Sequence, residues 1–164
     1  MKIKYIIILL AVFTLALSCN KDSEDGKDYN VLKVTSGDHS GYTQAYSPNQ
    51  GYWAVVSATA KYVHLLFGSA DNMVVQGKDV ISILYYDEGL GMVAFPSAQG
   101  QHANIGFTVE GTEEYYMADG AQLTIEELSD NRFVGYLAGQ FISTTSSETI
   151  NVTMDIDVEM IQLR

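Results

Sequence analysis

The sequence is short of cysteine, of basic residues and of closely spaced histidines, and each shortage argues against a class of chemistry. Cys19 is the one cysteine in 164 residues, so an intrachain disulfide is excluded and a thiolate metal cluster is too. Nine lysines and arginines stand against 20 acidic residues, and the net charge of −11 argues against a nucleic-acid partner. His39, His64 and His102 show no His-x-x-x-His spacing, so we predict no metal ion and no cofactor.

A serine-hydrolase motif is also missing. The run Gly37-Asp38-His39-Ser40-Gly41 places His39 where a nucleophile elbow needs serine. Its histidine is more simply a turn residue, as His64 is a strand residue and His102 a loop residue. An enzyme is therefore our third hypothesis, and the sequence predicts that the protein is not one.

The first residues combine positive charge with a short apolar run. Lys2 and Lys4 precede 13 uncharged residues, Tyr5 to Leu17. A helix of that length is about 20 Å long, whereas a bilayer core is about 30 Å thick. The pattern predicts a cleaved secretory signal over residues 1–18, with an uncleaved anchor helix as the alternative.

Cys19 follows the expected cleavage point directly. In this arrangement the chain resembles a bacterial lipoprotein, with Leu15-Ala16-Leu17-Ser18 before the cysteine. The resemblance implies that the signal is removed before Cys19 and that lipid is attached to its sulfur and new amino terminus. Several acyl chains on one residue would hold the protein stably in a membrane. An ordinary signal peptidase reading Ala16-Leu17-Ser18 as small-x-small is the alternative.

The polar tract after Cys19 predicts a tether. Its dense charge cannot support a core, so we expect residues 19–28 to be disordered. Lys21-Asp22 and Glu24-Asp25 resemble the signal that sends Bacteroidota lipoproteins to the cell surface. That resemblance implies an outer-membrane lipoprotein on the cell surface, with the periplasmic face as the alternative. Loss of Lys2 and Lys4 with the signal leaves seven basic residues and a formal charge of −13.

Residues 29–164 have the size of one domain and read as short strands between turns. The clearest strand alternates Ile150, Val152, Met154, Ile156, Val158 and Met160 with polar residues. The expected strands cover residues 29–35, 53–57, 62–67, 80–86, 91–95, 103–109, 114–117, 123–128, 132–143 and 150–160. Chain breaks are expected at residues 48–51 and 119–120, and a hairpin turn at 129–131.

Nine or ten such strands predict an all-β fold, either an antiparallel β-sandwich or a closed or partly open β-barrel of lipocalin-like shape. Residues 52–67 also fit a helical face, but their β-branched and aromatic content favours two strands. Gly135 and Gly139 share one face of a strand with Phe133, Leu137 and Phe141. Such glycines indicate a sharp bend or a close approach of neighbouring backbone.

A second resemblance rests on the order of motifs. Trp53-Ala54, then Ala121 to Ile125, then Gly139-Gln140-Phe141 resembles an uncharacterised family of small Bacteroidota lipoprotein domains. The resemblance covers residues 52–158. It implies a barrel or sandwich and a place in the envelope, and it implies no known activity.

Aromatic residues supply the hint of binding. Tyr42, Tyr46, Tyr52 and Trp53 fall within twelve residues around an expected loop. Such rings stack on sugars or anchor protein partners, although strands also favour them for packing. The leading hypothesis is a non-enzymatic module that binds a glycan or protein through these residues. The alternative is a lipocalin-like carrier of a small apolar ligand inside the barrel.

The lipid anchor gives the first testable prediction. We expect Cys19→Ser to move the protein from the membrane fraction to the soluble fraction, because the acidic domain itself is repelled by anionic lipid. Fractionation and intact mass of the native product check this. An unmodified thiol at Cys19, or unchanged membrane retention of the variant, would contradict it.

Overall fold

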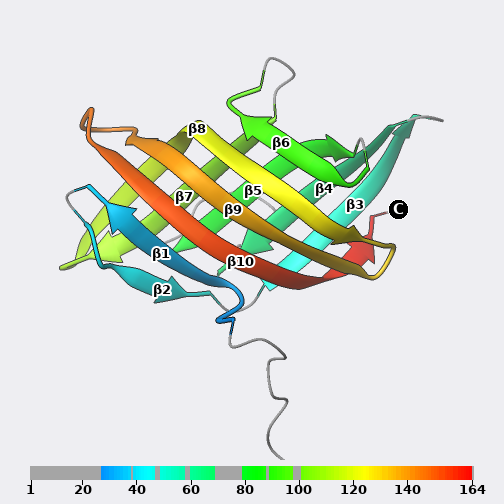
Figure 1. Cartoon of the computed structure of the whole chain (residues 1–164), viewed down its shortest axis with the longest axis horizontal. Helices are drawn as coiled ribbons and strands as arrows, with labels where there is room; N and C mark the ends of the chain where they lie inside the picture. The colour runs from blue at the N-terminus through cyan, green and yellow to red at the C-terminus, as the bar shows by residue number, and fades with distance from the viewer. Residues whose placement is uncertain are drawn as a thin grey trace, which may run out of the picture.

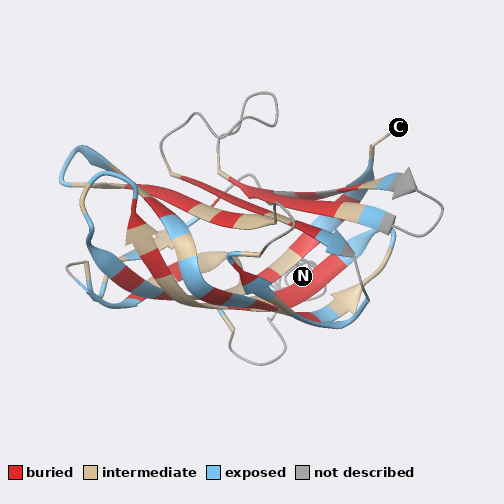
Figure 2. Cartoon of the chain, turned by 90° about the horizontal axis from the view of Figure 1, so that it is seen from above, coloured by how far each residue is buried: buried red, intermediate tan, exposed pale blue. Residues whose placement is uncertain are grey.

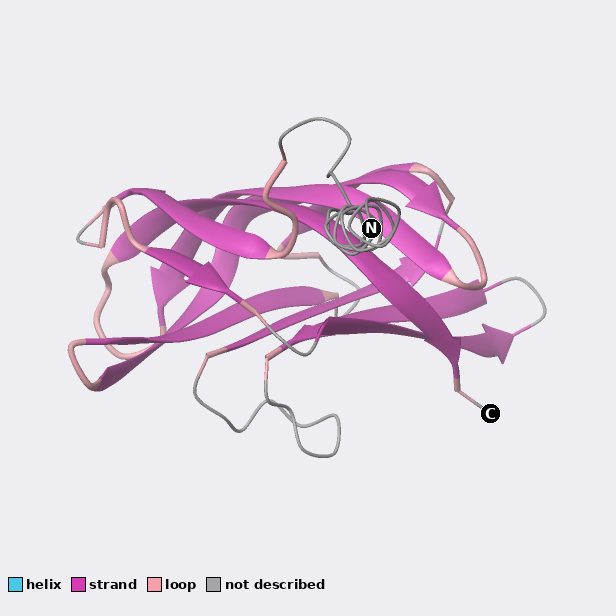
Figure 3. Cartoon of the chain, turned by 90° about the horizontal axis from the view of Figure 1, so that it is seen from below, coloured by secondary structure: helices cyan, strands magenta, loops and turns pink. Residues whose placement is uncertain are grey.

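The computed structural model describes residues 27–37, 39–46, 49–57, 60–68, 79–87, 89–97 and 101–163. These residues form ten strands and no helix, which confirms the predicted all-β fold (Figures 1 and 3). Accordingly, no helix able to cross a membrane occurs in these ranges. The predicted signal over 1–18 and the tether over 19–28 lie outside the described residues, except for Lys27 and Asp28.

The strands follow the chain in this order: β1 Val31–Ser36, β2 Thr43–Ala45, β3 Asn49–Ser57, β4 Ala60–Phe67, β5 Val80–Asp87, β6 Gly91–Phe95, β7 His102–Val109, β8 Thr112–Leu128, β9 Arg132–Ser143 and β10 Thr149–Gln162. The pairs β3–β4, β4–β5, β5–β7, β7–β8, β8–β9 and β9–β10 are antiparallel. A short parallel contact between β10 and β3 closes the ring. Strands β6 and β1–β2 extend it from β8 and β10.

Strand β10 confirms the predicted alternation. Its even-numbered residues from Ile150 to Met160 are buried, each at most 4% exposed, whereas the odd-numbered residues between them are exposed or half-buried. Figure 2 shows the same alternation of buried and exposed bands along the strands of both layers. The buried faces meet inside the ring and form the core.

Strand β8 corrects the predicted break at Asp119-Gly120. The sequence predicts two strands there, but residues 112–128 form one. The two turn residues make a bulge instead, because the pairing with β9 shifts between Ala118 and Ala121. Residues before the bulge pair with β7 and residues after it pair with β6, so β8 passes from one layer to the other (Figure 1). A bulge bends a strand at such a corner.

Strand β3 corrects the second predicted break. The prediction ends a segment at residues 48–51, but Asn49 to Gly51 belong to β3. Asn49 pairs with Phe67 of β4, and Gly51 pairs with both Leu65 of β4 and Met160 of β10. Pairing of all three residues with β4, and of Gly51 with β10 as well, outweighs the turn preference of the residues themselves. Pro48 lies outside the described residues.

The predicted close approach at Gly135 and Gly139 is confirmed. A Cβ atom on Gly139 would lie 2.5 Å from the Cα atom of Ala121 and 2.5 Å from the carbonyl oxygen of Gly120. A Cβ atom on Gly135 would fall on the carbonyl oxygen of Thr124. Both glycines therefore let β9 approach the backbone of β8 where the sheet bends.

Four aromatic rings fill one end of the ring. Tyr42 stacks on Phe107 at 4.8 Å between centroids, and Phe107 stacks on Tyr116 at 5.3 Å. His39 meets both Phe107 and Tyr116 edge-on. His39 lies in the turn between β1 and β2, as predicted. This hairpin therefore carries two rings, His39 and Tyr42, into the aromatic cluster, hereafter the aromatic plug.

Three glycines separate the effect of backbone angle from that of crowding. Gly120 has a φ of 107° but open space around its Cβ position, Gly135 has crowding without a positive φ, and Gly139 has both, with a φ of 135°. We expect Gly120→Ala to cost about 1–2 kcal/mol of unfolding free energy and Gly139→Ala about 2–5 kcal/mol. Gly135→Ala should fall between them. Urea denaturation measures all three, and equal losses at Gly120 and Gly139 would contradict the close approach.

Candidate ligand-binding site

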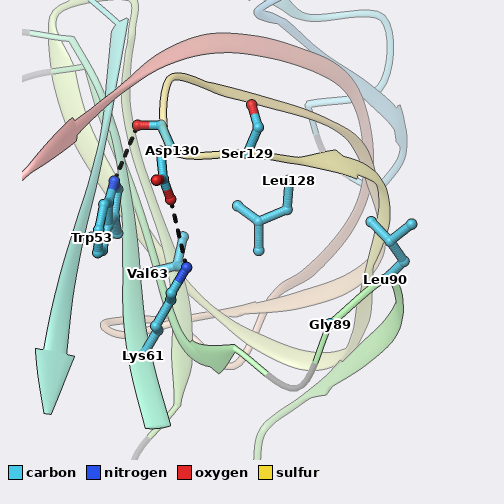
Figure 4. Close-up of a pocket in the computed structure, with 8 residues that line it drawn as sticks. All are labelled: Trp53, Lys61, Val63, Gly89, Leu90, Leu128, Ser129 and Asp130. Carbon is cyan, nitrogen blue, oxygen red and sulfur yellow. Dashed lines mark hydrogen bonds and ion pairs between the residues drawn. The ribbon is translucent and has the colours of Figure 1, made fainter. Parts of the chain in front are cut away.

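A pocket of about 140 Å³ opens between the β3–β4 hairpin and the β8–β9 turn (Figure 4). In Figure 1 the β8–β9 turn lies at the end of the ring away from the β1–β2 hairpin, which carries part of the aromatic plug. Strands β3 and β4 form one wall, and the segment after β5 and the β8–β9 turn form the other. We call it the mouth pocket, and its lining residues are Trp53, Lys61, Val63, Gly89, Leu90, Leu128, Ser129 and Asp130. A dry cavity of this size holds a ligand as large as benzene.

Trp53 is the fixed element of the mouth pocket. It belongs to the buried core and is 8% exposed. Its Nε1 atom donates a hydrogen bond to the carbonyl oxygen of Asp130 at 3.1 Å. Asp130 is held in turn by the β8–β9 turn, where the hydroxyl of Ser129 accepts a hydrogen bond from the backbone nitrogen of Arg132 at 3.1 Å. The indole ring is therefore held by core packing and by its hydrogen bond to the β8–β9 turn.

Lys61 supplies the positive charge of the mouth pocket. Its Nζ atom lies 4.8 Å from the centre of the Trp53 ring and 3.6 Å from Oδ1 of Asp130. Register explains the first contact, because Trp53 pairs with Val63 and Val55 pairs with Lys61. Lys61 therefore sits diagonally across from Trp53 on the same face of the hairpin.

The structure separates the four aromatic residues singled out by the sequence. Tyr42 and Tyr46 lie at the plugged end, where the hydroxyl of Tyr46 donates to the carbonyl oxygen of Gly106 at 3.4 Å. Tyr46 is 4% exposed, and burial raises the pKa of its phenol. Trp53 lines the mouth pocket. The backbone of Tyr52 pairs with His64, but its side chain lies outside the described residues. Cys19 lies outside them too.

Sequence reasoning missed the two charged members of the mouth pocket. Lys61 and Asp130 are far from each other in sequence and carry no motif. The sequence predicts the hairpin of residues 53–57 and 62–67 but not its register. The register is what places Lys61 beside Trp53. The predicted turn at 129–131 is confirmed, but nothing in the sequence shows that it faces Trp53.

A second polar cluster links three strands of the wall. The Nε2 atom of His64 on β4 lies 2.8 Å from the hydroxyl of Ser82 on β5. The same hydroxyl lies 3.5 Å from Nε2 of His102. His102 is the first residue of β7, so its predicted place in a loop is wrong. Ser82 is 1% exposed, and a substrate in solution therefore has no access to this Ser–His contact.

Burial sets the charge of His64. The side chain is 5% exposed, and this desolvation, with the nearby His102, lowers its pKa to about 4. Its Nδ1 atom finds no hydrogen-bond partner among the described residues. His64 is therefore neutral at pH 7, and the cluster acts as a polar contact within the wall.

Comparison of the chain with protein-family models, with curated proteins and with solved structures gives no match.

His64 makes stability depend on pH in a defined window. Because its pKa is 6.5 when unfolded and about 4 when folded, the unfolded chain binds more protons between these values. The folded state should lose about 3 kcal/mol of stability as pH falls from 6.5 to 4. His64→Gln, which does not titrate, should show a shallower pH dependence. Urea denaturation at several pH values measures both, and parallel curves for the two proteins would contradict the assignment.

Proposed function

We propose that the protein is a lipid-anchored binding module of the bacterial envelope that takes a small ligand in the mouth pocket without changing it chemically. The observation that carries the proposal is the pocket itself, in which a fixed indole, apolar side chains and one charge pair converge. Ligand sites commonly lie at the mouths of barrels and combine apolar walls with a few polar groups.

The packing of the rings refines the aromatic-loop hypothesis. Tyr46 is buried, and Tyr42 is stacked in the aromatic plug, so Trp53 is the one beside the mouth pocket among the three whose side chains the structure describes. A glycan or a protein side chain would therefore meet Trp53 at the mouth pocket and not a row of loop aromatics. The small volume favours one sugar ring or one side chain.

The alternative of a carrier is less well supported by the interior. Leu65, Ile83 and Phe141 belong to the core inside the ring and are 0% exposed. Ligand space beside these residues would require the core to open. The mouth pocket offers space without that cost.

The anchor is the second part of the proposal. The lipid on Cys19 would hold the domain at the outer membrane, on the cell surface or on the periplasmic face. Seven residues lie between Cys19 and Lys27 in the sequence, so a fully extended chain would place the two at most about 29 Å apart. Membrane attachment is then independent of the mouth pocket.

Trp53 is the one tryptophan of the sequence and reports on the mouth pocket directly. We expect its fluorescence to change saturably with at least one class of small ligand. The probes are monosaccharides and neutral, cationic and anionic fragments of about six to twelve non-hydrogen atoms, sized to the cavity. The absence of any saturable change with every class would overturn the proposal.

A matched pair of variants tests where the ligand binds. Leu90 lines the mouth pocket and is 68% exposed, whereas Met92 is 72% exposed and lies outside it. Leu90→Ser should weaken binding about fivefold through lost apolar contact, and Met92→Ser should leave it unchanged. Equal effects of the two substitutions would place the ligand elsewhere.

A further inference from the structure

The mouth pocket already holds a cation. The ammonium group of Lys61 lies 4.8 Å from the centre of the Trp53 ring and 3.6 Å from the carboxylate of Asp130. An aromatic face combined with a carboxylate is a general way to bind an organic ammonium group. The side chain of Lys61 therefore shows how such a group would sit.

The receptor for this cation is rigid, but its occupant is loosely held. Trp53 is buried, and its hydrogen bond to the Asp130 backbone does not involve Lys61. The Lys61 side chain is 47% exposed, and the Asp130 side chain is 78% exposed. A surface ion pair between a long flexible side chain and an exposed carboxylate contributes little stability. Lys61 can therefore move into solvent while the Trp53 ring and the backbone of Asp130 stay in place.

The charge of the protein favours a cation over an anion at this site. The formal charge is −11 for the full chain and −13 once residues 1–18 are removed. A field of that sign concentrates cations near the surface and repels anions. An anion would also have to displace Asp130 from Lys61, whereas a cation would displace Lys61 from Asp130.

We propose that the mouth pocket binds a small free organic cation, such as a quaternary or primary ammonium compound, which replaces the ammonium group of Lys61 over Trp53 and beside Asp130. This inference rests on the proposed function and names the ligand class. The methyl or methylene groups of the cation would contact Val63, Leu90 and Leu128. The volume of about 140 Å³ limits the ligand to one compact head group.

The test uses the mature lipidated protein in a neutral detergent and follows Trp53 fluorescence. The probes are choline and its uncharged isostere 3,3-dimethylbutan-1-ol, with benzoate as the anion and glucose as the neutral sugar. We expect choline to bind at least tenfold more tightly than the isostere. We also expect choline binding to weaken as the salt concentration rises. Binding of the isostere as tight as that of choline would overturn the inference.

Substitutions of the two charged residues should change choline binding in opposite directions. Lys61→Met removes the competing ammonium, so it should tighten choline binding several-fold, whereas Asp130→Asn should weaken it about tenfold. Lys33→Met is the matched control, because Lys33, on β1, is similarly exposed at 45% and forms a similar ion pair, with Asp28 at 3.4 Å. It should leave choline binding unchanged. Weaker binding of choline to Lys61→Met would overturn the inference.

The failure of this inference is distinguishable from failure of the proposed function. If benzoate or glucose changes Trp53 fluorescence saturably and choline does not, the mouth pocket binds a ligand of another class and the ammonium assignment is wrong. If none of the four probes and no fragment class does so, both proposals fall.

Discussion

Closure of the strand ring through β10 is the constraint on which the rest of the structure depends. One edge of β10 pairs with β9 along eleven residues, from Thr149 to Glu159. The other edge is shared, because its first part pairs with β1 and its last residues pair with β3. The contact with β3 is parallel and only three residues long, so most of the closure depends on packing of the alternating buried side chains of β10.

The shared edge makes the two ends of the ring different. At the end where β10 begins, the β1–β2 hairpin carries His39 and Tyr42 onto Phe107 and Tyr116, and this end is filled with rings. At the other end β3 takes the place of β1. It brings Trp53 to the rim, and Val55, on the same face of β3, is 60% exposed beyond it. The domain is thus filled by aromatic rings at one end and carries the mouth pocket at the other.

The parts of the fold that were predictable are those where one pattern dominates locally. The alternation from Ile150 to Met160 indicates a half-buried strand without knowledge of its neighbours. The prediction at Asp119-Gly120 is wrong because residues that favour turns also occur in bulges. Here β8 pairs with β9 both before and after these two residues, and this pairing makes them a bulge. Asn49 to Gly51 misleads for the same reason, since pairing with β4 and β10 keeps the strand extended.

The candidate site was predictable only in part, because it depends on long-range register. Residue type alone singles out Trp53, but it singles out Tyr46 as well, and burial of Tyr46 follows from the path of a three-residue strand. Asp130 is 77 residues from Trp53 in sequence, and their contact exists because β8–β9 and β3–β4 end at the same rim. Strong core packing fixes these hairpins, and the side chains at their ends remain free to exchange partners. A rigid indole beside an exchangeable ion pair is an arrangement by which a stable all-β core could carry the proposed site for an organic cation.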